Sequence, residues 1–250
     1  LKKALFDYLL WMGDTTLVIG HRLSEWCGHG PILEEDIALT NIALDLIGQA
    51  RLYLTYAGEI EGKGRTEDDI AHFRDVMAYR NSLLVEQPNG DFAYTMARQF
   101  LFTAFLYHMQ EALLNSSDER IRSIAEKATK EVTYHLRHSS DWMIRLGDGT
   151  EESHKKIQEA LNIVWMYVDD LFLMLPGDKL LADEKIVPDM ATIHTKWNET
   201  VKHVLKEATL TQPTESFMMK GGREGKHSEH LGYILAELQF LARAYTDAKW

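Results

Sequence analysis

Residues 91–115 of this chain read DFAYTMARQFLFTAFLYHMQEALLN, and their apolar side chains cover every side of a helical wheel. A helix that is apolar all round belongs in the interior of a protein. Asp91 is the expected N-cap, because it follows a turn at residues 88–90. Five polar residues keep the run from being a membrane span: Arg98, Gln99, His108, Gln110 and Glu111. We expect a buried central helix, and between Asp91 and Glu111 it carries no carboxylate.

Composition and charge exclude several classes of function. The chain has 250 residues, of which 45% are hydrophobic, as in an ordinary soluble globular protein. Its net charge of -11 argues against nucleic acid and anionic membranes as partners, since both are bound through basic patches. Cys27 is the only cysteine, which excludes an intrachain disulfide, and no charged-then-apolar signal segment opens the chain. We therefore expect a cytoplasmic protein.

Helical periodicity continues on both sides of the central segment, with turn residues between the runs. The expected helices cover residues 1–26, 34–60, 66–85, 118–146, 150–175, 191–209 and 229–247. A connector with Pro, Gly and Asp precedes residue 191, and residues 212–228 are expected to form a glycine-rich loop. No alternating run is long enough to demand a strand. The sequence predicts one all-α domain over residues 1–250, a four-helix bundle with additional flanking helices.

Long helical bundles can hold two iron ions through inward Glu residues and Glu-x-x-His pairs. An i, i+3 pair places both ligands on one face of one helix. Three such spacings occur, at Asp69 and His72, at Glu151 and His154, and at Glu224 and His227. The first two pairs lie at the start of their expected helices and the third lies in the glycine-rich loop. A bundle metal lies near the middle of its helices, so none of the three is well placed.

The best remaining metal candidate is at the centre of the helix expected over residues 118–146. His135 lies beside the apolar stripe, Glu131 lies about a quarter-turn off its axis at 100° per residue, and His138 follows. A bundle metal needs several carboxylates, but Asp45 faces away from its stripe and the central helix offers no inward carboxylate. We interpret Glu131 and His135 as a structural polar cluster that bonds across the bundle to a basic group.

Four stretches of the chain resemble the PaaC subunits of phenylacetyl-CoA epoxidase complexes. They are GDTTLVIGHRLSEWCGHGPILEEDIALTNIALDLIGQAR (residues 13–51), YRNSLLVEQPNGDF (79–92), KEVTYHLRHSSDWMIRLGDGTEES (130–153) and HSEHLGYILAELQFLARAY (227–245). The resemblance covers nearly the whole chain and is looser near residues 176–190 and 211–226. It implies a ferritin-like fold and a structural subunit that is not itself catalytic and holds no cofactor of its own.

The same resemblance implies partners. In that family the subunit PaaA is ferritin-like and holds the di-iron centre, and a separate reductase subunit delivers electrons. The complex oxygenates phenylacetyl-CoA to its ring 1,2-epoxide in aerobic phenylacetate degradation. This chain would support the catalytic subunit, and apolar residues taken as a set are expected at the contact, whereas each one taken alone is more readily explained as core or scattered surface: Trp11, Trp26, Phe217, Met218 and Met219. Association into a homo-oligomer is left open.

Two other functions remain open from the residues. The first is a di-iron hydroxylase with a cryptic metal site of its own, built on Glu131, His135, His138, Asp69 and His72. The second is a free-standing ferritin-like store, which would need carboxylate-rich inner helix faces that the sequence lacks. The metal content of the purified chain separates these alternatives from a structural subunit.

A contact with a CoA thioester is a further hypothesis. Tyr79, Arg80 and Asn81 bring an aromatic ring, a guanidinium and an amide together near the expected end of the third helix. Arg suits a phosphate because its planar fork bonds two oxygens at once. Lys179, beside Asp178 in the connector, would supply a second positive charge. The alternative is a helix surface on which Arg80 pairs with a carboxylate of this acidic chain.

Overall fold

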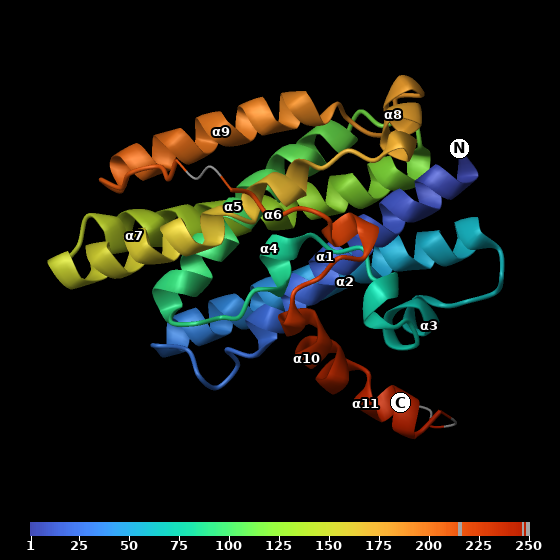
Figure 1. Ribbon diagram of the computed structural model, residues 1–250, viewed down its shortest axis with the longest axis horizontal. Coiled ribbons are helices and arrows are strands. Elements are labelled where there is room, and N and C mark those ends of the chain that lie inside the picture. The colour runs from blue at the N-terminus through green and yellow to red at the C-terminus, as the bar shows by residue number, and fades with distance from the viewer. Residues whose placement is uncertain (215–216, 247, 249–250) are drawn as a thin grey trace. The chain divides into compact units, whose positions relative to one another are not determined.

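The computed structural model describes residues 1–214, 217–246 and 248, and its regular elements within them are helices (Figure 1). The predicted fold class, an all-α ferritin-like bundle with flanking helices, is confirmed. The chain forms two compact units: unit 1 comprises Leu1–Gln87 and Gly221–Trp250, and unit 2 comprises Pro88–Lys220. The assignment of all 250 residues to one domain stays a prediction. Among the described residues, none of the helices combines the length and apolar character that crossing a bilayer requires.

Unit 2 is built around the segment that the sequence marks as central. Helix α5 (Phe92–Leu113) packs against α6 (Glu119–Gly147), α7 (Glu151–Trp165) and α9 (Met190–Glu207). The Asp91 side chain accepts a hydrogen bond from the Tyr94 amide at 2.9 Å, as expected of an N-cap. Apolar side chains on all sides of α5 are buried, including Phe100, Leu101 and Phe102. The predicted buried helix is confirmed.

The connections of unit 2 contain more structure than predicted. The helix expected over residues 150–175 ends at Trp165 and is followed by the 3₁₀ helix η2 (Val168–Phe172). The expected connector contains a short helix, α8 (Pro176–Asp183). Pro176 stands in its first turn, where a missing amide hydrogen costs nothing, and the Asp178 carboxylate accepts the Leu175 amide at 2.8 Å. Local capping therefore builds a helix where composition favoured a loop.

Unit 1 pairs two long helices, α1 (Lys2–Ser24) and α2 (Leu33–Glu61). The prediction of one helix over residues 66–85 is wrong. That stretch contains α3 (Glu67–His72), the 3₁₀ helix η1 (Val76–Ala78) and α4 (Leu83–Glu86). The Asp14 carboxylate of α1 accepts the Arg80 backbone amide at 2.9 Å. A backbone amide that donates to a distant carboxylate cannot also donate to the carbonyl four residues earlier, as an α-helix requires. The long-range hydrogen bond therefore replaces the helical one.

The C-terminal part of unit 1 departs from the expected continuous helix. It contains η3 (Gly222–Glu224), α10 (Glu229–Leu238) and α11 (Phe240–Ala244). Gln239 lies at the break, where its buried amide donates to the Ala71 and Arg74 carbonyls at 3.0 and 2.9 Å. The expected end of this helix at residue 247 falls outside the described residues.

Candidate functional site

Unit 1 contains a buried ion pair between Asp14 of α1 and Arg74, which follows α3. The Arg74 Nη1 donates to Asp14 Oδ2 at 2.9 Å and its Nη2 donates to Oδ1, so the fork is bidentate. The Asp14 side chain is 0% exposed and the Arg74 side chain is 7% exposed. Burial lowers the pKa of Arg74, but the Asp14 carboxylate outweighs burial and holds the pKa above its usual value. The pair fixes the irregular stretch after α3 to α1.

A second buried pair joins Glu86 of α4 to His227, 141 residues later. His227 Nδ1 lies 3.0 Å from Glu86 Oε2, and its Nε2 lies 3.1 Å from the Tyr79 carbonyl oxygen. Both side chains of the pair are almost fully buried, with His227 1% and Glu86 0% exposed. Glu86 also accepts the Ser228 amide at 2.6 Å and the Asn81 side-chain amide at 3.0 Å. This network anchors the start of α10 to α4.

Two further contacts tie the C-terminal segment to the rest of unit 1. The Arg223 guanidinium lies 4.0 Å from the centre of the Trp11 ring, a cation–π contact on α1. Gly225 adopts a positive φ of 81°, and a side chain there would meet the Met77 carbonyl at 2.6 Å. Only glycine fits such an approach without strain. The segment that precedes α10 is therefore held by polar and backbone contacts as well as by apolar packing.

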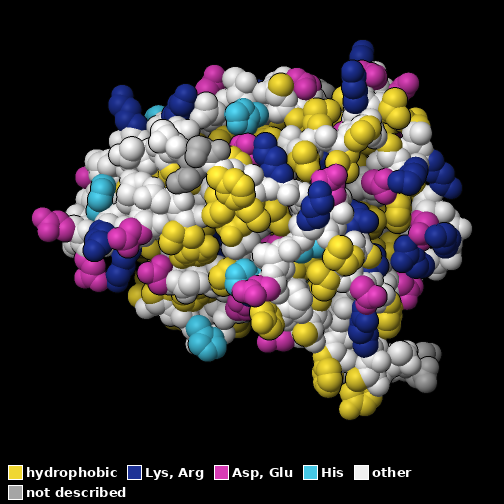
Figure 2. All heavy atoms as spheres, viewed as in Figure 1, with side chains coloured by type: hydrophobic (Ala, Val, Ile, Leu, Met, Phe, Trp, Pro, Cys, Tyr) yellow, Lys and Arg dark blue, Asp and Glu magenta, His cyan; other side chains and the backbone are white. Residues whose placement is uncertain are grey.

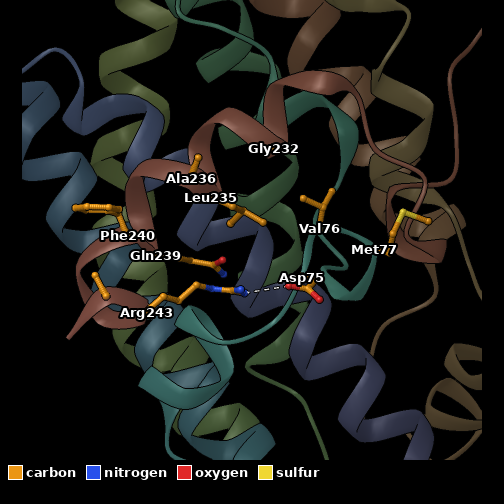
Figure 3. Close-up of a pocket in the computed structure, with 10 residues that line it drawn as sticks. Asp75, Val76, Met77, Gly232, Leu235, Ala236, Gln239, Phe240 and Arg243 are labelled. Carbon is orange, nitrogen blue, oxygen red and sulfur yellow. Dashed lines mark hydrogen bonds and ion pairs between the residues drawn. The ribbon is translucent and has the colours of Figure 1, made fainter. Parts of the chain in front are cut away.

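A cavity of about 630 Å³ opens at the edge of unit 1 (Figure 3). Val76 and Met77 line it from η1, while Leu235 and Phe240 line it from the two C-terminal helices. Arg243 donates to Asp75 Oδ1 at 3.2 Å, and the pair closes one side of the cavity (Figure 3). The lining offers apolar surface and no nucleophile placed beside a base, so it is suited to contact rather than to chemistry.

Large exposed apolar side chains lie on η1, α10 and α11 and just after α11, and two of them, Met77 and Phe240, line this cavity. Figure 2 shows hydrophobic atoms gathered over the C-terminal helices, where Figure 1 places α10 and α11. The large exposed residues there are Met77, Tyr233, Phe240, Leu241 and Tyr245, which are 69%, 67%, 64%, 53% and 60% exposed. Helix α11 has no buried residue, and Arg243 holds it by donating to the His72 and Arg74 carbonyls. These five residues are called the C-terminal apolar patch below.

Tyr79, Arg80 and Asn81 do not form a common surface. Tyr79 is buried, donates its hydroxyl to the Ala71 carbonyl, and has its pKa raised by burial. Asn81 is buried in the Glu86 network. Arg80 is half-buried, and its guanidinium donates to the Met77 and Tyr79 carbonyls at 2.9 and 2.7 Å. They lie between η1 and α4 rather than at the end of a long helix, and their contact with a CoA thioester stays a prediction.

Asp178 and Lys179 belong to unit 2, whereas Tyr79, Arg80 and Asn81 belong to unit 1. Asp178 is buried and caps α8, while the Lys179 side chain is exposed. A substrate role for either residue stays a prediction.

The proposed metal residues are also divided between the units. Glu131, His135 and His138 lie on α6, whereas Asp69 and His72 lie on α3. Asp69 completes a capping box by accepting the Thr66 amide at 2.8 Å, and His72 Nδ1 lies 3.0 Å from the Asp68 carbonyl. Among the described residues, no three His, Cys, Asp or Glu side chains come together as metal ligands. A di-iron centre needs several converging carboxylates, which the described His, Asp and Glu side chains do not provide.

The structural interpretation of Glu131 and His135 stays a prediction. His135 is fully buried, and Glu131 Oε1 lies 3.8 Å from Lys127 Nζ on the same helix. That ion pair is local rather than across the bundle.

The other i, i+3 pairs found in the sequence make structural contacts. His227 of the Glu224/His227 pair bonds to the buried Glu86, and His154 Nδ1 lies 2.6 Å from the Gly147 carbonyl.

The apolar residues expected at the interface with a partner fall into three groups by exposure. Trp11 is a core residue at 1% exposure, and its indole donates to Ser82 Oγ at 3.0 Å, so the core alternative holds for this residue. Phe217 and Met219 are exposed, at 61% and 36%. Met218 and Trp26 are half-buried. Trp11 is buried because the C-terminal segment covers its face of α1. Helical periodicity alone does not show that this face is covered.

Sequence reasoning missed the buried charges of unit 1. Asp14 stands among the apolar residues of α1, and Glu86 follows the apolar run at residues 83–85. A carboxylate inside an apolar stretch is a signal of a buried, paired charge. The partners, Arg74 and His227, lie 60 and 141 residues away and carry no local signal of their own.

Comparisons with known proteins agree with the resemblance seen in the sequence. The sequence model of a family described as "Phenylacetic acid catabolic protein", covering PaaA and PaaC, matches residues 1–250. The chain is 46% identical over 243 residues to one of the subunits of the 1,2-phenylacetyl-CoA epoxidase of Escherichia coli (strain K12). The match covers 97% of this chain and 98% of the relative.

Proposed function

Because the chain belongs to the phenylacetic acid catabolic protein family, we propose that it is a structural subunit of a multicomponent phenylacetyl-CoA epoxidase. The observation that carries this proposal is the 46% identity to a 1,2-phenylacetyl-CoA epoxidase subunit along nearly the full length of both chains. In such a complex, phenylacetyl-CoA is oxygenated to its ring 1,2-epoxide. This chain contributes folded support and contact surface to the subunit where that oxygenation takes place.

The side chains of the chain favour a supporting role over a catalytic one. The central helix α5 carries no carboxylate between residues 91 and 111, so its inner face offers no oxygen ligand of the kind that iron needs. Asp69 is used in capping, and the α6 candidates lie in the other unit. The di-iron centre of the proposed complex therefore belongs to a partner of the PaaA type, with a reductase subunit as the source of electrons.

The C-terminal apolar patch is the surface that we assign to contact with another subunit. Five large apolar side chains are exposed by more than half on η1 and the C-terminal segment, with Met77 and Phe240 lining one cavity and Leu241 and Tyr245 lining another, which exceeds the scattered exposure usual on a monomer. Aromatic and Met side chains are enriched at protein interfaces, and this patch contains three aromatic rings and Met77. Phe217 and Met219 of unit 2 form a separate exposed pair.

Subunit exchange tests the proposal. The chain replaces its relative in a mixture with the other subunits of the Escherichia coli epoxidase, and the epoxide formed from phenylacetyl-CoA is measured. We expect turnover that requires this chain, together with co-elution of the mixed complex. The chain alone should bind less than one iron per molecule and give no product. Failure to co-elute, or oxygen-dependent product from the isolated chain, would contradict the proposal.

A contact between Arg80 and the CoA ester is tested in the same assembly. The Arg80 guanidinium is half-buried at the surface of unit 1 and could reach a phosphate if it released the Met77 carbonyl. We propose that Arg80→Ala raises KM for phenylacetyl-CoA several-fold and leaves co-elution unchanged. Lys179→Ala, which removes an exposed cation of unit 2, reports on the second half of that hypothesis. An unchanged KM with weakened co-elution would make Arg80 an interface residue.

A further inference from the structure

Met77 is the most exposed methionine of the chain. All ten methionines lie in the described residues, and Met77, in η1, is 69% exposed. Met219 follows at 36%, and the other eight are half-buried or buried. Hydrogen peroxide oxidises a thioether that solvent reaches, whereas a buried thioether is shielded by the atoms packed around it. Exposure therefore marks Met77 as the first methionine to be oxidised.

The backbone around Met77 is fixed, although its side chain is exposed. The Met77 carbonyl accepts the Arg80 guanidinium at 2.9 Å, and the Tyr79 amide donates to the Val76 carbonyl at 3.1 Å. Gly225 packs so closely that a side chain at its position would meet the Met77 carbonyl at 2.6 Å. The thioether takes no part in these contacts. An oxygen added to the sulfur therefore changes the surface and leaves the backbone in place.

The Met77 side chain belongs to the C-terminal apolar patch. It lines the cavity of about 630 Å³ together with the apolar side chains of Val76, Leu235 and Phe240 (Figure 3). A thioether is apolar, whereas a sulfoxide is polar. Burying a polar group without a hydrogen-bond partner is unfavourable. Oxidation of Met77 therefore makes this part of the patch less suited to being covered by an apolar surface.

We propose that Met77 is a redox-sensitive modification site, and that its oxidation to the sulfoxide makes the C-terminal apolar patch polar and weakens it as a contact surface. The oxidant is hydrogen peroxide. The sulfur lone pair attacks one peroxide oxygen, so a sulfur–oxygen bond forms and the oxygen–oxygen bond breaks. The hydroxide that leaves takes the proton from the transferred oxygen and becomes water. The sulfur loses two electrons, and the peroxide gains them.

The oxygen chemistry of the proposed complex gives this site a use. Hydrogen peroxide is the two-electron reduction product of dioxygen, so an epoxidase that reduces oxygen without transferring it to its substrate releases peroxide. A chain oxidised at Met77 would then stay out of the complex until its sulfoxide is reduced, a reaction that methionine sulfoxide reductases catalyse. This use rests on the proposed function, whereas the oxidation of Met77 and the change in the patch do not.

The first experiment locates the oxidation. The purified full chain is treated with dilute hydrogen peroxide in a Cys27→Ser background, because Cys27 is an exposed thiol that would also react. Peptide mass mapping follows the gain of one oxygen at each methionine. We expect Met77 to be oxidised at least about twofold faster than Met219, as its larger exposure implies, and buried Met109 to stay intact while circular dichroism stays native. Equal rates at Met77 and Met219 would overturn the assignment.

The second experiment measures the apolar character of the patch by retention on a phenyl column. Peroxide should shorten the retention of the Cys27→Ser chain and of its Met219→Leu variant. The Met77→Leu variant should elute at the same place before and after peroxide, because leucine has no sulfur to oxidise. Met77→Gln, which carries a permanent polar group, should elute early without peroxide. A Met77→Leu variant that loses as much retention as the others would show that oxidation acts through another residue.

The third experiment measures binding to the other subunits of the Escherichia coli epoxidase. Oxidation at Met77 should raise the dissociation constant by about tenfold, and methionine sulfoxide reductase should reverse the change. Met77→Leu should bind equally before and after peroxide. An oxidised chain that binds as tightly as the untreated one overturns the effect on contact. An untreated chain that does not bind at all contradicts the proposed function alone, and the mass map and the phenyl column then decide the inference.

Discussion

Two buried arginines, one in each unit, reach their partners by different routes. In unit 2, buried Arg98 of α5 donates to the Pro88 carbonyl at 3.0 Å and to Asn89 Oδ1 at 2.6 Å, partners only ten and nine residues away. In unit 1, Arg74 reaches Asp14 across 60 residues, and His227 reaches Glu86 across 141. A buried side chain that bonds to a nearby residue leaves the helical hydrogen bonds of its segment in place. A partner far along the chain can replace those hydrogen bonds. The helix predicted for α5 therefore forms, whereas the single helix predicted for residues 66–85 does not.

Because the buried pairs of unit 1 join residues far apart in sequence, its stability should depend strongly on single side chains. Arg74→Ala is expected to show the largest loss. The substitution leaves the Asp14 carboxylate buried without its guanidinium. We expect the free energy of unfolding to fall by about 3–5 kcal/mol, the cost typical of breaking a buried pair from one side. Urea unfolding followed by circular dichroism measures the loss.

Lys3→Ala is the control for Arg74→Ala. It removes an ion pair whose lysine is 89% exposed and whose Asp7 partner is 34% exposed. Such surface pairs contribute about 0–1 kcal/mol, so the control should unfold almost like the natural chain. Equal losses for Lys3→Ala and Arg74→Ala would show that the buried charges of unit 1 are not what holds residues 66–87.

The core of unit 2 is tested by Leu101→Ala on α5. Leu101 is fully buried, and removing its side chain loses apolar contact and leaves a cavity at about 2–5 kcal/mol. We expect about 3 kcal/mol, because α5 is enclosed on all sides and its neighbours have little freedom to close the space. Leu180→Ala, at a position 54% exposed on α8, should change stability by less than about 0.5 kcal/mol. A loss at Leu101 as small as that at Leu180 would contradict the central position of α5.

The third prediction concerns acid sensitivity at the end of α1. Burial, with a smaller contribution from the charge of His72, lowers the pKa of His21 to about 4. The unfolded chain takes up this proton near pH 6.5, well before the folded chain does. The stability that depends on a neutral His21 is therefore complete above about pH 6.5, falls as the pH drops, and is fully lost near pH 4.

His21→Gln should remove that slope, because glutamine does not titrate. The difference in unfolding free energy between the natural chain and His21→Gln should change by about 1–2 kcal/mol between pH 7 and pH 4.5, after allowance for partial exposure of the ring. His203→Gln, whose ring is 71% exposed, is the control and should leave the pH profile unchanged. Parallel profiles for the natural chain and His21→Gln would disprove the prediction.

The smallest effect is expected at the N-cap of α5. Asp91→Ala removes the carboxylate that accepts the Tyr94 amide and should cost about 1 kcal/mol. Asp91→Asn keeps an acceptor and should cost less than half of that. Losses above about 2 kcal/mol for Asp91→Ala would mean that α5 depends on its end contacts as strongly as unit 1 depends on its buried pairs.

The sequence by itself determined the elements whose information is local. The apolar run at residues 91–115, the N-cap at Asp91 and the helical stripes of α1, α2, α6 and α9 all lie within a few turns of the residues that produce them. Periodicity reports directly on which side of a helix is buried. The absence of carboxylates between Asp91 and Glu111 is also a property of the sequence, and the fold places that stretch at the buried centre of unit 2.

Only the tertiary structure decided which charges are buried and which apolar faces are left uncovered. Trp11 and Leu44 both lie on apolar helix faces, yet Trp11 is covered by Arg223 and Leu44 is 62% exposed. Whether Asp14 is solvated or paired depends on where Arg74 lies, 60 residues along the chain. The hydrophobic pattern of a helix shows which face prefers to be buried. Long-range packing decides what covers that face, because the groups that cover apolar surface or pair with a charge are distant in sequence.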